Sequence, residues 1–266
     1  MLRKHAKIEP ERFYYHCDQL GMLVWQDMVN GGSAYKHWFV TYLATLMNWN
    51  HISFSDDEKH AGLLSRLHPE GKDEFRREIT ETIAFLYNHP SIVVWVPFNE
   101  GWGQFDALAV CEQIRTLDSS RLVDHASGWF DQKGGDILSL HYYFLKLKFK
   151  PESKRAAALT EFGGYSLSIP GHSCCKKVYG YKKFNSTGTL TYGYIDLIRQ
   201  TILPAVKKGI GATVYTQLSD IEEETNGIYT YDREICKIDP DTLRKWNRAL
   251  KEAGECKTYA DHTTDH

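Results

Sequence analysis

The feature that most constrains the fold is a regular alternation of short apolar runs with segments of helical periodicity. About six runs after Gly21 have the character of strands, and each ends in polar or aromatic residues. This alternation is typical of parallel β-strands joined by helices. The strand ends read QDM, FNEGW, DHASGW, HYYF, TEFGG and YTQLSD. At 266 residues the chain could form one large barrel-like domain or two smaller domains.

Helices are expected between these strands. The first starts at Pro10, a favourable N1 position, turns Phe13, Cys17 and Leu20 inward, and ends at Gly21. Further helices are predicted at 73–89, 107–117, 191–208 and 239–254. The expected inner face is Phe75, Ile79, Ile83 and Leu86 in 73–89, and Ala107, Val110, Ile114 and Leu117 in 107–117. In 191–208 it is Ile195, Ile198, Ile202 and Ala205, and Pro204 is expected to kink the last turn. Residues 29–72 are expected to form a long loop with one short helix near 38–47, and loops of this length are usually functional.

Composition excludes several classes of function. A formal net charge of -2 gives no electrostatic case for binding nucleic acid or an anionic membrane surface. The sequence has no apolar run of about 18 residues and no signal peptide, which leaves localisation open. It contains neither H-E-x-x-H nor G-x-x-x-x-G-K-[ST], so no metal and no cofactor are predicted. The six cysteines (17, 111, 174, 175, 236 and 256) show no C-x-x-C spacing and are expected to be mostly free thiols.

Two glutamates each follow an apolar run and precede glycine. Glu100 lies in VPFNEGWG and Glu161 in ALTEFGG. Cleavage of a glycosidic bond needs two carboxyl groups, separated by about 5 Å in retaining and about 6.5–9.5 Å in inverting enzymes. A single glutamate at a strand end is more often a helix-cap partner or a surface charge. The presence of two favours a glycosidase, although spacing alone leaves both interpretations open.

The residues themselves resemble glycoside hydrolase family 2. HPSIVVWVPFNEGWGQFD resembles the strand-4 motif of that family, and LTEFGG its strand-7 motif. EPERFYYHCDQLGMLVWQDM is similar to its helix-2 to strand-3 segment, and VYTQLSDIEEETNGIYTYDRE to its strand-8 region. The resemblance runs from residue 1 to about residue 250. It implies a (β/α)8 TIM barrel that hydrolyses terminal β-glycosidic bonds with retention and takes a carbohydrate substrate.

The resemblance assigns roles to individual residues. It implies Glu100 as general acid/base and Glu161 as nucleophile. Asn99 matches the residue that binds the sugar 2-hydroxyl, and Tyr143 matches a tyrosine that hydrogen-bonds the nucleophile. Arg3 resembles an arginine that pairs with the nucleophile and holds it ionised.

The remaining candidates are sugar contacts. His5, Asp27 and His141 occupy positions where such contacts are expected, and Trp102 or Tyr215 could supply a stacking face. Each has a structural alternative: Asp27 could cap the following loop, and His141, like Tyr143, could be a satisfied core group. Tyr215 departs from the tryptophan usual on that strand, while His125 and Trp129 are interpreted as structural. Pro97 cannot donate a hydrogen bond and is expected to end strand pairing before Asn99.

The sequence also departs from the family pattern at its start. It opens in what resembles barrel strand 2, so residues 1–254 are expected to form a partial barrel and 255–266 a polar tail. A barrel without strand 1 would have unpaired edges, which could support an oligomer. A truncated gene model, a degraded gene or completion by a partner chain would each explain the pattern.

Two other functions stay open. A non-catalytic carbohydrate-binding or assembly module could derive from the same barrel. A Schiff-base aldolase would need a lysine at a strand end, and Lys146 and Lys148 are the nearest candidates. The identity of the sugar is not readable, since YKKFNSTG contains Lys182 and Lys183 but no N-x-K pattern of the glucuronidase type.

Overall fold

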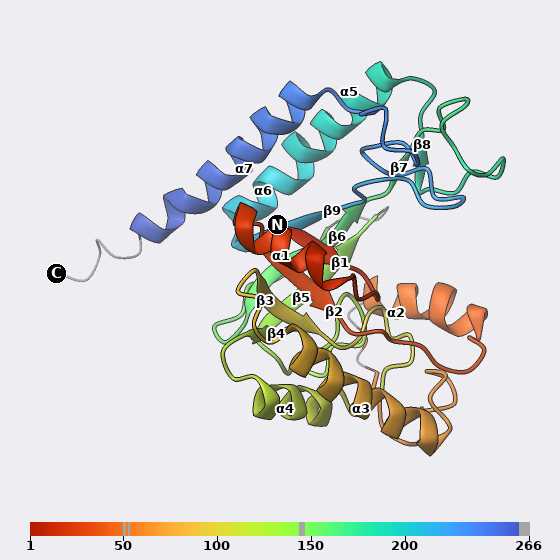
Figure 1. Cartoon of the computed structure of the whole chain (residues 1–266). Helices are drawn as coiled ribbons and strands as arrows, with labels where there is room; N and C mark the ends of the chain where they lie inside the picture. Colours follow the sequence, from red (N-terminus) through yellow and green to blue (C-terminus); the bar gives the residue numbers. More distant parts are fainter. Residues whose placement is uncertain (50–51, 53, 144–146, 261–266) are drawn as a thin grey trace. The chain divides into compact units, whose positions relative to one another are not determined.

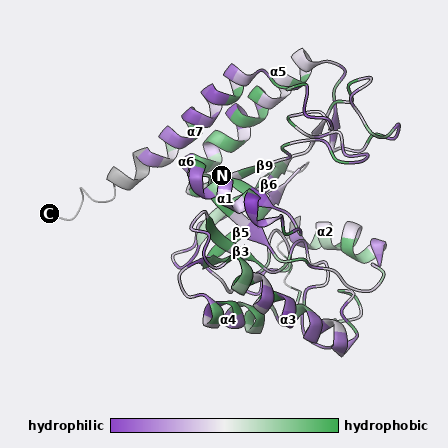
Figure 2. Cartoon of the chain, in the orientation of Figure 1, coloured by the Kyte–Doolittle hydropathy of each residue, from purple (hydrophilic) through white to green (hydrophobic). Residues whose placement is uncertain are grey.

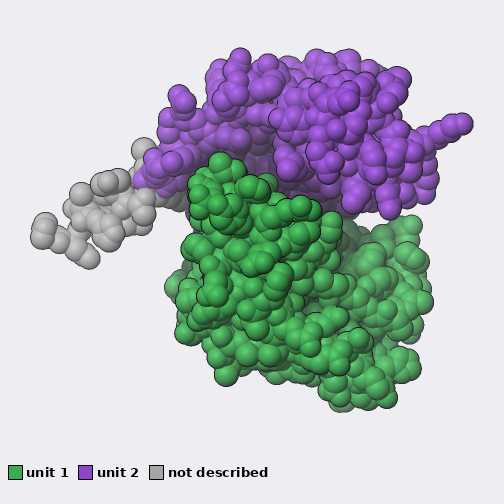
Figure 3. All heavy atoms as spheres, in the orientation of Figure 1, with its two compact units in different colours: residues 1–141, 152–156 green, residues 142–151, 157–266 purple. Residues whose placement is uncertain are grey.

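The computed structural model describes residues 1–49, 52, 54–143 and 147–260. These residues form two compact units, coloured separately in Figure 3. The described residues within 1–141 and 152–156 form unit 1, and those within 142–151 and 157–266 form unit 2. The described part contains no helix that is both long enough and apolar enough to span a membrane.

Unit 1 is built on a parallel sheet. Its strands are β1 (Leu2–Lys4), β2 (Val24–Asp27), β3 (Ile92–Val96) and β4 (Leu122–Val123), in the spatial order β1-β2-β3-β4. Trp25 pairs with Val94 and Asp27 with Val96, so β2 and β3 end side by side. The helices are α1 (Glu11–Leu20), π-helix η1 (Trp38–Leu43), α2 (Ala44–Trp49), α3 (Pro69–Leu86) and α4 (Ala107–Leu117) (Figure 1). Strand β5 (Ile137–Tyr142) follows β4 along the chain.

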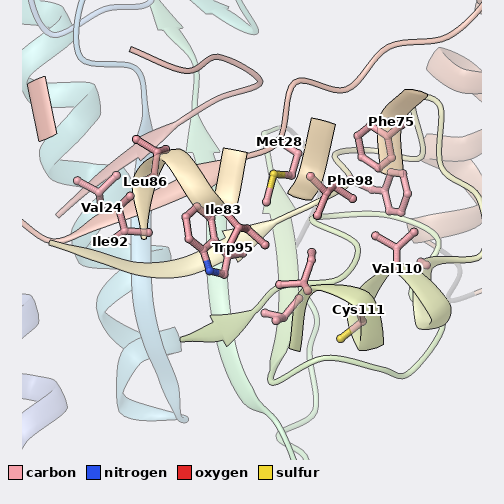
Figure 4. Close-up of a cluster of buried hydrophobic side chains, with 14 of the residues drawn as sticks. Val24, Met28, Phe75, Ile83, Leu86, Ile92, Trp95, Phe98, Val110 and Cys111 are labelled. Atoms are coloured by element: carbon pink, nitrogen blue, oxygen red, sulfur yellow. The ribbon is translucent and has the colours of Figure 1, made fainter. Parts of the chain in front are cut away.

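The core of unit 1 lies between this sheet and its helices. Phe75, Ile79, Ile83 and Leu86 of α3 are all buried, as their spacing predicts. They pack with Trp95 of β3, and Figure 4 shows side chains of α3, β3 and α4 converging in this cluster. Burying a side chain of this size contributes about 1.5–3 kcal/mol. This packing holds the strand that leads to Asn99 and Glu100.

The predicted inner faces of the other helices are largely confirmed. Ala107, Val110 and Ile114 of α4 are buried and Leu117 packs against them. The prediction for Leu20 is wrong, because this residue is 78% exposed and the buried side chains of α1 are Tyr14 and Cys17. Gly21 ends α1 in the left-handed conformation (φ +63°), as expected of a C-terminal glycine.

Unit 2 holds the second group of parallel strands. Strands β6 (Ala156–Gly163) and β9 (Ile210–Thr216) pair in parallel, with Phe162 opposite Tyr215. A small parallel pair, β7 (Tyr165–Ser166) and β8 (Lys182–Lys183), was not predicted. The helices are α5 (Thr187–Leu197), π-helix η2 (Ile198–Ile202), α6 (Leu203–Lys207) and α7 (Pro240–Ala260).

The long helical segment of unit 2 is irregular near Pro204, as predicted. The π-helix η2 lies immediately before α6, which starts beside the proline that cannot donate a backbone hydrogen bond. Ile198, Ile202 and Ala205 are buried, whereas Ile195 is only half-buried. Figure 2 shows α7 mostly in hydrophilic colours. The expected tail 255–266 overlaps the end of α7, and residues 261–266 lie outside the described part of the chain.

Candidate active site

The end of β3 delivers two polar side chains in succession. Regular pairing stops at Val96, directly before Pro97, and Asn99 then forms an isolated bridge with Ser127. The Glu100 amide donates to the Ser127 carbonyl at 2.9 Å, and Glu100 itself is left-handed (φ +50°). A non-glycine residue in this conformation costs about 1–2 kcal/mol, and such strain is concentrated at functional sites.

Asn99 belongs to a charged network at the ends of β1, β2 and β3. Arg3 Nη2 donates to Asn99 Oδ1 at 2.8 Å. Arg3 also forms a two-point pair with Asp27, at 3.0 Å through Nε and 2.9 Å through Nη2. Because Arg3 donates to the amide oxygen of Asn99, this contact leaves the hydrogen-bond donors of the Asn99 amide unused.

Asp27 is buried within this network. Its Oδ2 also lies 3.2 Å from Nδ1 of His5 and accepts the Ala6 amide at 3.4 Å. Burial raises the pKa of Asp27, but the Arg3 charge and His5 outweigh it, and the net pKa is lowered. The side chain is only 3% exposed, whereas that of His5 is 59% exposed. His5 is therefore the more accessible of the two candidate sugar contacts.

Glu100 is held by His141 of β5. Nδ1 of His141 lies 2.8 Å from Oε1 of Glu100, and Nε2 of the same ring lies 3.1 Å from Ser127 Oγ. The ring rests against Gly128, where an added Cβ would lie 2.6 Å from Nδ1. Glycine at 128 is therefore required for this placement of the imidazole.

The loop that carries Glu100 is tied to the long loop after β2. Arg66 Nε donates to the Gly103 carbonyl at 2.9 Å, and Arg66 Nη2 donates to Asn30 Oδ1 at 2.8 Å. Trp102 packs against Tyr35 with ring centroids 4.3 Å apart. A cavity of about 490 Å³ lies beside these residues, lined by Asn30, Arg66 and part of α3, and none of the predicted site residues lines it.

Asp124, which follows β4, was not predicted from the sequence. Its side chain is buried, and neither oxygen makes a hydrogen bond of normal geometry in the described structure. Burial raises the pKa of Asp124 to about 6, and the Arg3 charge and the nearby Ser139 hydroxyl offset this only in part. The strand-end segment DHAS was the available signal. The neighbouring His125, interpreted as structural from the sequence, accepts a hydrogen bond from the Gln132 amide through Nε2.

In unit 2, Glu161 near the end of β6 is held by Tyr143. The Tyr143 hydroxyl donates to Glu161 Oε2 at 2.5 Å and lies 2.9 Å from Thr216 Oγ1 at the end of β9. The Tyr143 ring stacks on Tyr181 at a centroid distance of 4.0 Å. Thr216 and Tyr181 were not predicted from the sequence, because their contacts with Tyr143 depend on which segments the fold brings together.

Tyr215 on β9 is half-buried and packs against neighbouring rings of unit 2. Its ring meets Phe162 and Tyr194 edge to face, each at 5.5 Å, and would clash with a Cβ at Gly163. Burial raises the pKa of its hydroxyl. These contacts are those of a packing residue and weigh against a stacking face for sugar at this position.

A lysine, a cluster of possible metal ligands and the separation of the two glutamates complete the description. The aldolase candidate Lys146 lies outside the described residues. His172, Asp232 and Glu234 of unit 2 each place one possible metal-ligand atom within 4.8 Å of the others, and His172 Nδ1 pairs with Asp232 at 2.7 Å. The predicted separation of Glu100 and Glu161 concerns one residue of each unit and stays a prediction.

Parallel strands with carboxylates and their hydrogen-bond partners at the carboxyl ends define an α/β domain of the barrel-enzyme class. Residues 9–203 match the family model for glycosyl hydrolases family 2, TIM barrel domain. The chain therefore belongs to that family, and its expected α/β TIM-barrel fold class is confirmed.

Curated proteins with similar sequences are glycosidases by name. The β-mannosidase B of Thermothelomyces thermophilus is 32% identical over 94 residues, which is 35% of this chain and 8% of that protein. The β-galactosidase of Leuconostoc mesenteroides subsp. mesenteroides is 26% identical over 263 residues, which is 93% of this chain and 22% of that protein. The chain thus spans less than a quarter of either relative.

Solved structures support the fold. The β-D-glucuronidase of Dictyoglomus thermophilum matches with a TM-score of 0.61 at 15% identity, over 92% of this chain and 44% of that chain. The Ruminococcus gnavus β-glucuronidase gives a TM-score of 0.61 at 14% identity, over 94% of this chain and 44% of that chain. At these identities the likeness concerns the fold alone.

Proposed function

We propose that this chain carries the catalytic carboxylates of a retaining β-glycosidase, with Glu100 as general acid/base and Glu161 as nucleophile. The observation that carries the proposal is that each strand-end glutamate has a dedicated hydrogen-bonding partner. His141 holds Glu100, and Tyr143 holds Glu161. Membership of glycosyl hydrolases family 2 supports the same reaction class.

The proposed reaction has two steps. Glu161 attacks the anomeric carbon while Glu100 gives its proton to the departing glycosidic oxygen, which forms a covalent glycosyl-enzyme. Water then attacks that carbon, Glu100 takes a proton from the water, and Glu161 is released. Tyr143 orients the Glu161 carboxylate through its hydroxyl.

The charged network is assigned to substrate positioning. Arg3 donates to the amide oxygen of Asn99, and the Asn99 amide nitrogen is assigned the role of donor to a sugar hydroxyl. Hydrogen bonds of this kind accelerate the reaction when they strengthen in the transition state. Asp27 fixes Arg3 and His5, and the exposed imidazole of His5 is assigned a direct sugar contact. The Trp102 ring is proposed to line the sugar-binding site.

An assay of aryl β-glycosides tests the proposal. The panel should hold β-mannosides, β-galactosides and β-glucuronides, since relatives bear these names. It should be applied to the chain alone and to the longest natural form of the protein. We expect Glu100→Gln and Glu161→Gln to lower kcat at least about 100-fold, whereas Glu81→Gln, on the exposed side of α3, should leave it unchanged. Sugar binding without turnover that survives both substitutions would instead support a non-catalytic carbohydrate-binding module.

A further inference from the structure

The loop of unit 2 between β7 and β8 carries two adjacent cysteines whose sulfur atoms converge. Sγ of Cys174 lies 3.4 Å from Sγ of Cys175. Both are free thiols, with Cys174 exposed and Cys175 half-buried. Successive side chains of an extended segment point to opposite sides. The local backbone of this loop therefore presents the two thiols together to solvent.

The separation of the sulfur atoms suits a shared ion better than a disulfide. A disulfide needs an S–S length of about 2.05 Å and Cα atoms usually 4.4–6.8 Å apart, whereas adjacent Cα atoms are only about 3.8 Å apart. A tetrahedral ion with two bonds of about 2.3 Å to sulfur places those sulfur atoms about 3.8 Å apart. The observed 3.4 Å is much closer to the second geometry.

The two thiols lie near a carbonyl oxygen and negatively charged side chains. Cys174 Sγ donates to the Glu222 carbonyl at 3.4 Å. The charges of Glu223 and Glu222 act on Cys175. Negative charge beside two sulfur donors favours a bound cation. Lys177 pairs with Glu223 at 3.7 Å and offsets that charge in part.

We propose that Cys174 and Cys175 form a dithiol site that chelates a thiol-seeking metal or metalloid ion. The two sulfur donors determine the class of ion that binds, because sulfur ligands select thiol-seeking ions such as Zn²⁺ and trivalent arsenic. With an arsine oxide, both thiol protons and the arsenic-bound oxygen leave as water, and two As–S bonds form. No oxidant or reductant is needed.

An ion bound to the two cysteines would also affect Glu161, because contacts of the same loop lead to the partner of that glutamate. Tyr179 donates its amide to the Glu223 carbonyl at 2.7 Å, and Tyr181 stacks on Tyr143, the partner of Glu161. This consequence rests on the proposed function, whereas binding at the two thiols does not. Chelation is therefore measured first by mass, and any change in glycosidase activity is measured separately.

Phenylarsine oxide is the probe of choice, because it forms stable rings with paired thiols only. The native chain should gain one phenylarsenic group, mapped to the peptide with residues 174–175, that survives excess glutathione and is removed by a dithiol. Cys174→Ser and Cys175→Ser should each lose this glutathione-resistant adduct, and Cys236→Ser should keep it. Unfolding temperatures would establish that each variant is folded.

Two results would overturn the proposal. One is a native chain without an adduct at residues 174–175, and the other is an adduct that persists in Cys174→Ser. Titration of the reduced protein with Zn²⁺ provides a second readout, in which the native chain should bind at least tenfold more tightly than either serine variant. Equal affinities would exclude a shared ion.

Discussion

Nδ1 of His141 lies 2.8 Å from Oε1 of Glu100, and this contact exists because residue 128 is glycine. The backbone of Gly128 (φ +85°) passes directly beside the imidazole ring. The second ring nitrogen is anchored by Ser127 at 3.1 Å. The strand-end glutamate is thus oriented by a histidine from β5 whose own position depends on a turn after β4.

Gly128→Ala should therefore impair the proposed acid/base step. The added methyl group would lie 2.6 Å from Nδ1 of His141 and force the ring away from Glu100. We expect kcat/KM to fall about 10- to 100-fold, with a larger loss for glycosides of poor leaving groups, which need protonation most. The measurement is kcat/KM across a series of aryl leaving groups.

Gly21→Ala is the matched control for that substitution. Gly21 is also left-handed (φ +63°), but a Cβ there would meet no atom within 4 Å. Both variants share a backbone cost of about 1 kcal/mol, and only Gly128→Ala displaces the imidazole. Equal kinetic losses in the two variants would show that strain, and not the His141 contact, is responsible.

Tyr143→Phe should weaken the nucleophile without unfolding unit 2. It removes the 2.5 Å hydrogen bond to Glu161 and keeps the ring that stacks on Tyr181. We expect kcat to fall at least about tenfold and the free energy of unfolding to fall by about 1 kcal/mol. Tyr192→Phe, at a 70% exposed position, should change neither. Unchanged kcat in Tyr143→Phe would remove Tyr143 from the site.

Asp118 should stabilise unit 1 in a defined pH window. Burial raises the pKa of this carboxyl, but Ser120, Arg121 and Trp95 outweigh it and lower the pKa to about 2. The folded protein therefore binds this proton more weakly than the unfolded chain does. The stabilisation, about 2 kcal/mol, is complete above about pH 4 and is lost as the pH falls to about 2.

Asp118→Asn tests this by urea unfolding at pH 7 and in acid. The variant should lose about 2 kcal/mol at pH 7, and its difference from the native chain should shrink toward pH 2. Asp241→Asn is the control, because Asp241 also pairs with an arginine three residues later at 2.6 Å but is 87% exposed. It should cost less than about 0.5 kcal/mol. Similar losses in both variants would contradict the role of burial.

Asp124→Asn should stabilise the protein at alkaline pH. Because burial raises the pKa of Asp124 to about 6, the folded state holds this proton more tightly than the unfolded chain. The charged form therefore opposes folding above pH 6, by at most about 3 kcal/mol. We expect a gain of about 1–3 kcal/mol at pH 8 that disappears as the pH falls toward 4. A loss of stability at pH 8 would show that the charge of Asp124 is compensated by its neighbours.

The periodicity of the sequence predicted the scaffold well. The inner face of α3 and the end of β3 before Pro97 were readable, because spacing and the missing proline donor are local properties. The predicted burial of Leu20 was wrong, because periodicity alone does not show how far along a helix the core extends. The pair β7–β8 was missed because two-residue strands carry no pattern.

The individual site contacts were less predictable. The placement of Asn99 and Glu100 at a strand end follows from their neighbours in the sequence. Ser127, Thr216 and Tyr181 became apparent only when distant segments were seen side by side. Asp124 was not recognised because its pKa depends on burial, which a four-residue segment does not reveal.

The most direct test of the account is covalent trapping with a 2-deoxy-2-fluoro-β-glycoside that carries a dinitrophenyl leaving group. It should be applied to the protein with the sugar identified in the glycoside panel, and the labelled peptide should be mapped by mass spectrometry. We predict one sugar per chain on Glu161, no label in Glu161→Gln, and labelling retained in Glu100→Gln because dinitrophenolate needs no proton. A label on any other residue, or turnover without a trapped intermediate, would contradict the assignment of Glu161 as nucleophile.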